Sequence, residues 1–121
     1  MKPWELFFKD KVGKIFLEKK NIIDIGGGLR ISQKQGNRYD KSRQWILPLA
    51  EKVDYKIMDP VPDYDPDIVG DIHALPLADN SVDAIICIAV LEHVEDPMKA
   101  SREILRVLKP GGYAFIYVPF L

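Results

Sequence analysis

The sequence has little of what would mark a secreted, membrane or nucleic-acid-binding protein. Its single cysteine, Cys87, lies within an apolar run, which excludes an internal disulfide framework and a cysteine zinc cluster. No apolar run approaches the roughly 18 residues that span a bilayer, and charges interrupt the N-terminal stretch where a signal peptide needs an apolar core. Lys and Arg number 17 against 18 Asp and Glu, so the net charge of -1 leaves no basic footprint. We therefore expect a soluble, cytoplasmic protein without nucleic-acid or membrane partners.

The order of the apolar segments predicts one α/β domain. A chain of 121 residues has the length of a single domain. Strands that alternate with helices or crossover loops favour a doubly wound, mostly parallel Rossmann-like sheet, with a ligand at the carboxyl ends of its strands. Helical spacing and apolar runs predict helices over residues 3–20, 45–53 and 97–108, and strands over 21–25, 54–59, 67–72, 82–90 and 113–118.

Local signals define the three helices further. Pro48 must lie in the first turn of the second helix or kink it, and Asp96 with Pro97 supplies the N-cap and first position of the third. Residues at spacings of three and four form the predicted buried faces. These are Trp4, Phe8, Val12, Ile15 and Phe16 in the first helix, and Met98, Ser101, Ile104, Leu105 and Leu108 in the third.

The stretch from 21 to 30, NIIDIGGGLR, is a predicted buried strand that runs into a glycine turn. Its three isoleucines suit a strand that is covered on both faces. The glycines Gly26–Gly28 allow a sharp turn and bring backbone N–H groups close to a polar ligand. A polar loop over residues 31–42 follows, and because long loops in compact domains are often binding loops, we predict that it forms a lid.

Four segments in this order resemble the class I S-adenosylmethionine-dependent methyltransferases. They are the DIGGG turn at 24–28, the acid that ends the next strand at Asp59, GDIHALP at 70–76 and VLEHVEDPMKASREILRVLKPGG at 90–112. The last segment is similar to the small-molecule branch typified by quinone-biosynthesis C-methyltransferases. The resemblance implies strand order 3-2-1-4-5, S-adenosylmethionine as cofactor, and methyl transfer to an O, N or C atom of a small-molecule acceptor.

The first half of the predicted site would hold the methionine end and the ribose. Gly26, Gly27 and Gly28 let the backbone approach the methionine carboxylate and the ribose, and Asp24 favours the cationic end of the cofactor. Asp59 is an acceptor that suits the two ribose hydroxyls. An aspartate at a strand end also commonly caps a turn, and that interpretation stays open for Asp59.

The second half of the site follows from the resemblance, position by position. It implies that Asp71 accepts from the adenine amino group, that the backbone N–H of Ile72 meets the ring, and that Ile88 and Ala89 line the methionine end. A turn-capping role also stays open for Asp71. His93 follows the fourth strand near the expected acceptor and is the candidate general base, although a histidine at a helix start is commonly structural.

Three departures from the family pattern keep alternatives open. Arg30 replaces the third glycine, so its side chain either points away from the cofactor or closes over it. The interval from Asp24 to Asp59 is about 15 residues longer than the roughly 20 expected in nucleotide-binding units, which we assign to the 31–42 loop. The sequence also lacks the last two family strands, so we expect a fragment or a partner-completed domain, with homo-oligomerisation through the fifth-strand edge as one outcome.

Two other functions compete with methyl transfer. A non-catalytic S-adenosylmethionine-binding or interaction module would explain Arg30 and the absent strands. A nicotinamide dinucleotide domain is disfavoured, because its fingerprint requires a third glycine where Ile31 stands.

Overall fold

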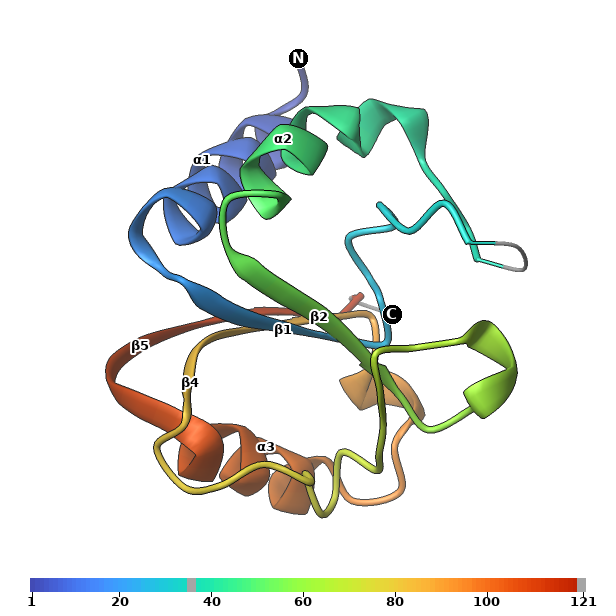
Figure 1. Cartoon of the computed structure of the whole chain (residues 1–121), viewed down its shortest axis with the longest axis vertical. Helices are drawn as coiled ribbons and strands as arrows, with labels where there is room; N and C mark the ends of the chain where they lie inside the picture. The colour runs from blue at the N-terminus through green and yellow to red at the C-terminus, as the bar shows by residue number, and fades with distance from the viewer. Residues whose placement is uncertain (35–36, 120–121) are drawn as a thin grey trace.

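The computed structural model describes residues 1–34 and 37–119 and contains a five-stranded parallel sheet (Figure 1). Its strand order, β3-β2-β1-β4-β5, confirms the prediction. β1 pairs with β2 on one side and with β4 on the other, so the most apolar strands lie in the middle of the sheet. The strands are β1 Asn21–Ile25, β2 Asp54–Asp59, β3 Ile68–Val69, β4 Val82–Ile88 and β5 Leu108–Tyr117.

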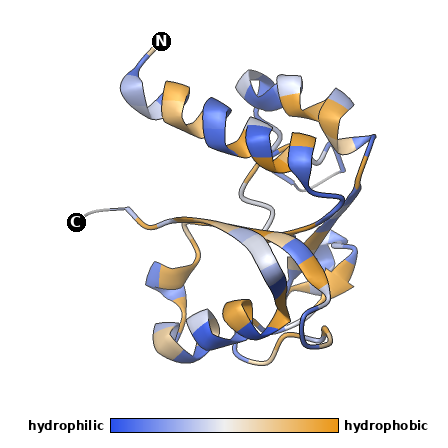
Figure 2. Ribbon diagram, turned by 90° about the vertical axis from the view of Figure 1, so that its left-hand side faces the viewer, coloured by the Kyte–Doolittle hydropathy of each residue, from blue (hydrophilic) through white to orange (hydrophobic). Residues whose placement is uncertain are grey.

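Helices cover both faces of the sheet and form three layers (Figures 1 and 2). One face carries α1 Pro3–Glu18, η1 Lys41–Ile46 and the single turn α2 Leu47–Ala50, and the other carries α3 Pro97–Val107. Two short 3₁₀ helices, η2 Pro62–Tyr64 and η3 Leu91–His93, lie in the connections. None of the helices within the described residues is long and apolar enough to cross a membrane.

The residues of β1 explain why each face has its own core. Ile22 packs into the apolar cluster under α1, whereas Ile23 and Ile25 pack into the cluster under α3. Successive side chains of a strand point to opposite faces, so a strand covered on both sides is apolar throughout. Asp24 shares the α1 face with Ile22 and is fully buried there.

The structure corrects the predicted buried face of α3. Ala100, Ile104 and Val107 face the sheet, whereas Met98 is 64% exposed and Leu105 is 72% exposed. The Arg106 guanidinium explains why α3 is rotated about its axis relative to the prediction. It donates to backbone carbonyl oxygens of the 75–77 segment, and the opposite side of the helix faces solvent.

The first and third helices and the fourth strand end one or two residues earlier than predicted, and three other elements differ more in extent. The predicted 45–53 helix is shorter and divided: residues 45–46 end the 3₁₀ helix η1 and residues 47–50 form α2, with Pro48 in the first turn of α2 as predicted. β3 has 2 residues instead of the predicted 67–72. β5 begins at Leu108 instead of 113, because Gly111 adopts a φ of 80° and an irregular register between Val82 and Ala84 lets the KPGG segment join the strand.

Candidate functional site

The predicted site residues gather where the carboxyl ends of β1, β2, β3 and β4 meet. The sheet order reverses between β1 and β4, which is the position where open α/β sheets bind ligands. Backbone contacts tie the strand ends together: Gly26 N donates to Met58 O over 2.7 Å, and Gly70 N donates to Asp59 O over 3.2 Å. Residues far apart in the sequence therefore share one edge.

The glycine turn packs directly against the end of β4. Gly26 and Gly27 adopt φ values of 77° and 64°, which L-residues with side chains rarely adopt. A Cβ atom on Gly28 would lie 2.7 Å from Ile88 Cβ and 3.1 Å from Ile88 O, so no side chain fits at that position. Gly26 itself is exposed, although its N–H already donates to Met58 O.

Asp24 lies beneath this turn. Its carboxylate accepts hydrogen bonds from Gly28 N at 3.0 Å, Leu29 N at 3.2 Å and the Tyr55 hydroxyl at 2.5 Å. Complete burial raises the pKa of Asp24 to about 7, although the three hydrogen bonds favour the ionised form. The structure thus directs the carboxylate of Asp24 into the protein, where it holds the turn, instead of toward the open edge.

Asp59 and Asp71 each cap a turn with one carboxylate oxygen. Asp59 Oδ1 accepts from Val61 N at 2.9 Å, and Asp71 Oδ1 accepts from His73 N at 2.8 Å. The His73 hydrogen bonds hold the pKa of Asp71 below its ordinary value. The Oδ2 atom of each has no hydrogen-bond partner within the part of the chain that the structure describes, so capping leaves one acceptor on each side chain.

The remaining predicted residues lie after β4 and β3. Ile88 is half-buried against the glycine turn, and Ala89 has a φ of 57°, a strained conformation for a residue with a side chain. Ile72 is buried in the core under α3. The His93 side chain is 78% exposed, and its Nε2 lies 3.7 Å from Glu92 Oε2.

Sequence reasoning missed several groups around the site. Tyr55 and Arg43 support the glycine turn: the Tyr55 hydroxyl contacts Asp24, and Arg43 Nη1 donates to Leu29 O at 3.2 Å. Glu92 has a buried Oε1 atom without a hydrogen-bond partner among residues 1–34 and 37–119. The position of Asp24 inside a strand that is buried on both faces indicates that polar partners lie nearby, but no sequence pattern identifies Tyr55 or Arg43 as residues near it.

The 31–42 loop leans against the β2–β3 connection. Asp40 N donates to Arg30 O at 2.9 Å and closes the base of the loop, while Lys34 Nζ donates to Asp65 O at 2.9 Å. Arg30 is exposed and has a φ of 56°. Residues 35 and 36, part of the predicted lid, lie outside the described residues.

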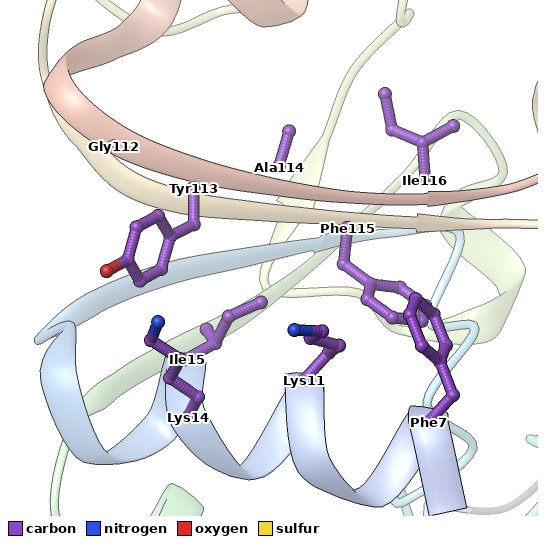
Figure 3. A pocket seen from close by; sticks show the side chains of 9 residues that line it. All are labelled: Phe7, Lys11, Lys14, Ile15, Gly112, Tyr113, Ala114, Phe115 and Ile116. Carbon is purple, nitrogen blue, oxygen red and sulfur yellow. The ribbon is translucent and has the colours of Figure 1, made fainter. Parts of the chain in front are cut away.

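A hollow between α1 and β5 lies away from this edge (Figure 3). It has a volume of about 390 Å³ and contains none of the predicted site residues. Tyr113 and Phe115 point toward α1, whereas Ala114 and Ile116 point to the opposite side of β5. It is lined by Phe7, Lys11, Lys14, Ile15, Gly112, Tyr113, Ala114, Phe115 and Ile116.

The fold and the edge site together define an α/β nucleotide-binding domain of the doubly wound type. Residues 45–116 match the family model described as a methyltransferase domain. The chain therefore belongs to the methyltransferase domain family, whose cofactor is S-adenosylmethionine.

Several relatives by sequence carry methyltransferase names. An uncharacterized methyltransferase of Mycobacteroides abscessus is 33% identical over 111 residues, which cover 84% of this chain and 40% of that protein. A demethylmenaquinone methyltransferase of Renibacterium salmoninarum is 56% identical over 45 residues, which cover 37% of this chain and 19% of that protein. The chain thus spans less than half the length of these two relatives.

Solved structures share the fold. A SAM-dependent methyltransferase from Aquifex aeolicus has a TM-score of 0.54 at 23% identity, over 95% of this chain and 66% of that chain. The [4+2]-cyclase SpnF has a TM-score of 0.53 at 24% identity, over 91% of this chain and 43% of that chain. The same fold therefore occurs in a protein named for a different reaction.

Proposed function

We propose that this chain forms the cofactor-binding part of a methyltransferase that methylates an O, N or C atom of a small molecule. The observation that carries the proposal is the glycine turn, which packs so closely against β4 that a Cβ atom on Gly28 would clash. At the same edge, the carboxylates of Asp59 and Asp71 each retain one acceptor oxygen. The small-molecule acceptor is supported by the sequence of residues 90–112 and by a net charge of -1.

The proposed binding mode extends along this edge. The backbone of Gly26–Gly28 takes the methionine end, with Ile88 and Ala89 as its wall. Asp59 Oδ2 accepts from the ribose hydroxyls, and Asp71 Oδ2 accepts from the adenine amino group. The capping and binding interpretations of the two aspartates are compatible, because capping uses the Oδ1 atoms.

Two further residues act through their surroundings. The backbone N–H of Ile72, which follows the Asp71 cap, is proposed to meet the adenine ring. Asp24 holds the turn in place, and its ionised form would add negative charge beneath the cationic end of the cofactor. We expect both contributions to be lost when the turn is displaced.

The chemistry that the bound cofactor supplies is a methyl group on a positively charged sulfur. Because that group is already activated, the protein has to position the acceptor and exclude water. His93 is our candidate for receiving a proton from the acceptor, since its imidazole is exposed and follows β4, where the family resemblance implies that the acceptor lies.

A carboxylate substitution tests the binding mode. Asp59→Asn keeps the Oδ1 cap on Val61 but replaces the free acceptor, so we expect S-adenosylhomocysteine to bind about tenfold more weakly by isothermal titration calorimetry. Asp63→Asn, at an exposed acid in η2, is the matched control and should bind as the wild type does. Failure of the wild-type chain to bind either S-adenosylmethionine or S-adenosylhomocysteine would refute the proposed function.

The alternative is a non-catalytic module that binds S-adenosylmethionine or a partner. The replacement of the third glycine by Arg30 favours it, and the cyclase neighbour shows that the fold alone does not specify methyl transfer. Methyl transfer by the full-length protein to any small-molecule acceptor would decide against this alternative.

We further propose self-association and a cytoplasmic location. β5 pairs with β4 on one side, and no strand among the described residues pairs with its other side. Exposed strand edges tend to pair, so a second copy is one candidate for this edge. The single buried Cys87 is compatible with a reducing compartment. Sedimentation velocity of the protein tests the first proposal, and localisation of a tagged full-length protein tests the second.

A further inference from the structure

His73 bridges two segments that belong to different parts of the fold. Its Nδ1 lies 2.7 Å from Asp71 Oδ1, in the turn after β3, and its Nε2 accepts a hydrogen bond from Asp96 N at 3.0 Å. Asp96 is the N-cap of α3, because its carboxylate accepts from Lys99 N at 3.1 Å. The imidazole is 20% exposed and is thus held on both sides.

This geometry specifies one tautomer of the ring. A backbone N–H is always a donor, so Nε2 must present its lone pair to Asp96 N. Nδ1 therefore carries the hydrogen and donates it to Asp71 Oδ1. A neutral imidazole satisfies both contacts, whereas a second hydrogen on Nε2 would face the Asp96 N–H and break that contact.

The two hydrogen bonds leave Asp71 with a defined orientation. Its Oδ1 accepts from both His73 N and His73 Nδ1, while its side chain stays 66% exposed. A second backbone bond, from Ala74 N to Asp71 O at 3.0 Å, closes the same turn. An exposed aspartate without these contacts would populate several rotamers, and ordering it would cost part of the binding free energy.

We propose that His73 is a positioning residue, which fixes the Asp71 carboxylate for the adenine amino group by tying it to the first residue before α3. The proposal rests on the proposed function and adds a specificity determinant to it. It also links the two ends of the cofactor site, because α3 follows the segment after β4 that is proposed to face the methionine end.

The probe for this role is a pair of ligands that differ at one position. S-inosylhomocysteine carries a carbonyl oxygen where S-adenosylhomocysteine carries the amino group, so this position accepts hydrogen bonds and no longer donates to Asp71. We expect wild-type protein to prefer the adenosyl ligand by about tenfold, the value of one charge-assisted hydrogen bond. The ratio of the two dissociation constants cancels any general weakening of the site.

Three single variants and one double variant separate positioning from folding. His73→Phe removes both contacts of the imidazole but keeps the backbone hydrogen bond from position 73 to Asp71 Oδ1, and it should remove much of the preference. His73→Asn places an amide donor near the position of Nδ1 and should restore the preference in part. Asp71→Asn should lose the preference, and adding His73→Phe to it should have no further effect, because the histidine acts through that carboxylate.

The outcomes distinguish this proposal from the proposed function. Absence of S-adenosylhomocysteine binding by the wild type would refute the proposed function, and with it this inference. Binding with an unchanged preference in His73→Phe would overturn the inference alone. Binding without any preference in the wild type would overturn it together with the proposed contact between Asp71 and the adenine amino group, while leaving cofactor binding itself intact. Nitrogen chemical shifts of the His73 ring give an independent readout: the Nε2–H tautomer would contradict the bridge.

Discussion

Two carboxylates at the same edge of the sheet hold turns in opposite environments. Asp24 is fully buried, and its described partners are Gly28, Leu29 and Tyr55, so both of its oxygens are used within the protein. Asp71 is exposed, and His73 occupies only its Oδ1. One acid is therefore a structural part of the site, while the other keeps an oxygen for a ligand.

The pKa values of the two acids move in opposite directions for physical reasons. Burial dominates at Asp24 and raises its pKa to about 7, because three hydrogen bonds do not replace the lost hydration of a charge. At Asp71 the hydrogen bonds from His73 dominate and lower the pKa, since exposure keeps the desolvation cost small. The same residue type thus serves as a titrating support at one turn and as a permanent charge at the other.

The largest expected contrast between Asp24 and Asp71 is the loss of stability when each side chain is removed. Asp24→Ala leaves one buried and two part-buried donors without an acceptor, and we expect a loss of about 3–5 kcal/mol in the free energy of unfolding. Asp71→Ala should cost far less stability, because its side chain is exposed. Urea unfolding followed by circular dichroism measures both. Equal losses in the two variants would contradict the contrast between them.

The pH dependence of stability sharpens the same comparison. Folding raises the pKa of Asp24 from 3.8 to about 7, so between these values the folded state keeps a proton that the unfolded state releases. Asp24 then contributes a decrease of about 2–4 kcal/mol in the free energy of unfolding as pH rises from about 4 to about 7.

Asp71 contributes with the opposite sign. Its folded pKa is lowered, so its stabilisation is present above the unfolded value and is lost as pH falls through the folded one. Denaturant midpoints below pH 4 test Asp71, and midpoints from pH 4 to pH 8 test Asp24. The difference between wild type and Asp24→Asn should change across this range, and a constant difference would show that Asp24 does not titrate there.

Adding a side chain at the glycine turn should change the stability by a smaller amount. Gly28→Ala places a Cβ atom 2.7 Å from Ile88 Cβ, so the turn or β4 must shift, at a cost of about 1–3 kcal/mol. Gly13→Ala is the control, because its Cβ would meet only Trp45 at 3.9 Å inside a helix. We expect thermal denaturation to show destabilisation in the first variant and none in the second. A fully stable Gly28→Ala would mean that the turn does not pack against β4.

The sheet could be predicted because its signals are local. The isoleucines of β1 and the bounds of β2 were read correctly, since apolar runs ending in Gly or Asp define buried strands directly. The buried face of α3 was not predictable from apolar spacing alone. Leu105 and Ile104 are both apolar, and the contacts of Arg106 with a loop about 30 residues earlier decide which one faces the sheet.

The site shows the same division. The positions of Gly28 and Asp59 follow from the order of strand and turn, and the structure brings them to one edge. The inward orientation of Asp24 depends on Tyr55, which lies 31 residues later on the neighbouring strand. The link between His73 and Asp96 likewise spans 23 residues, so no local pattern encodes it.

Arg30 offers the smallest expected effect and separates backbone from side chain at the glycine turn. Its φ of 56° suits glycine, so Arg30→Gly should relieve backbone strain in the folded state. Glycine also makes the unfolded chain more flexible, which offsets part of this stabilisation, so we expect the free energy of unfolding to rise by about 0.5 kcal/mol. Its N–H and C=O close the turn and the loop, whereas its side chain is exposed near Asp40. We therefore expect the calorimetric affinity of Arg30→Gly for S-adenosylhomocysteine to stay within about twofold of the wild type. This change is smaller than the loss of one hydrogen bond would give. Ala89→Gly tests the same conformation at the end of β4. A several-fold change confined to Arg30→Gly would mean that the guanidinium closes over the cofactor.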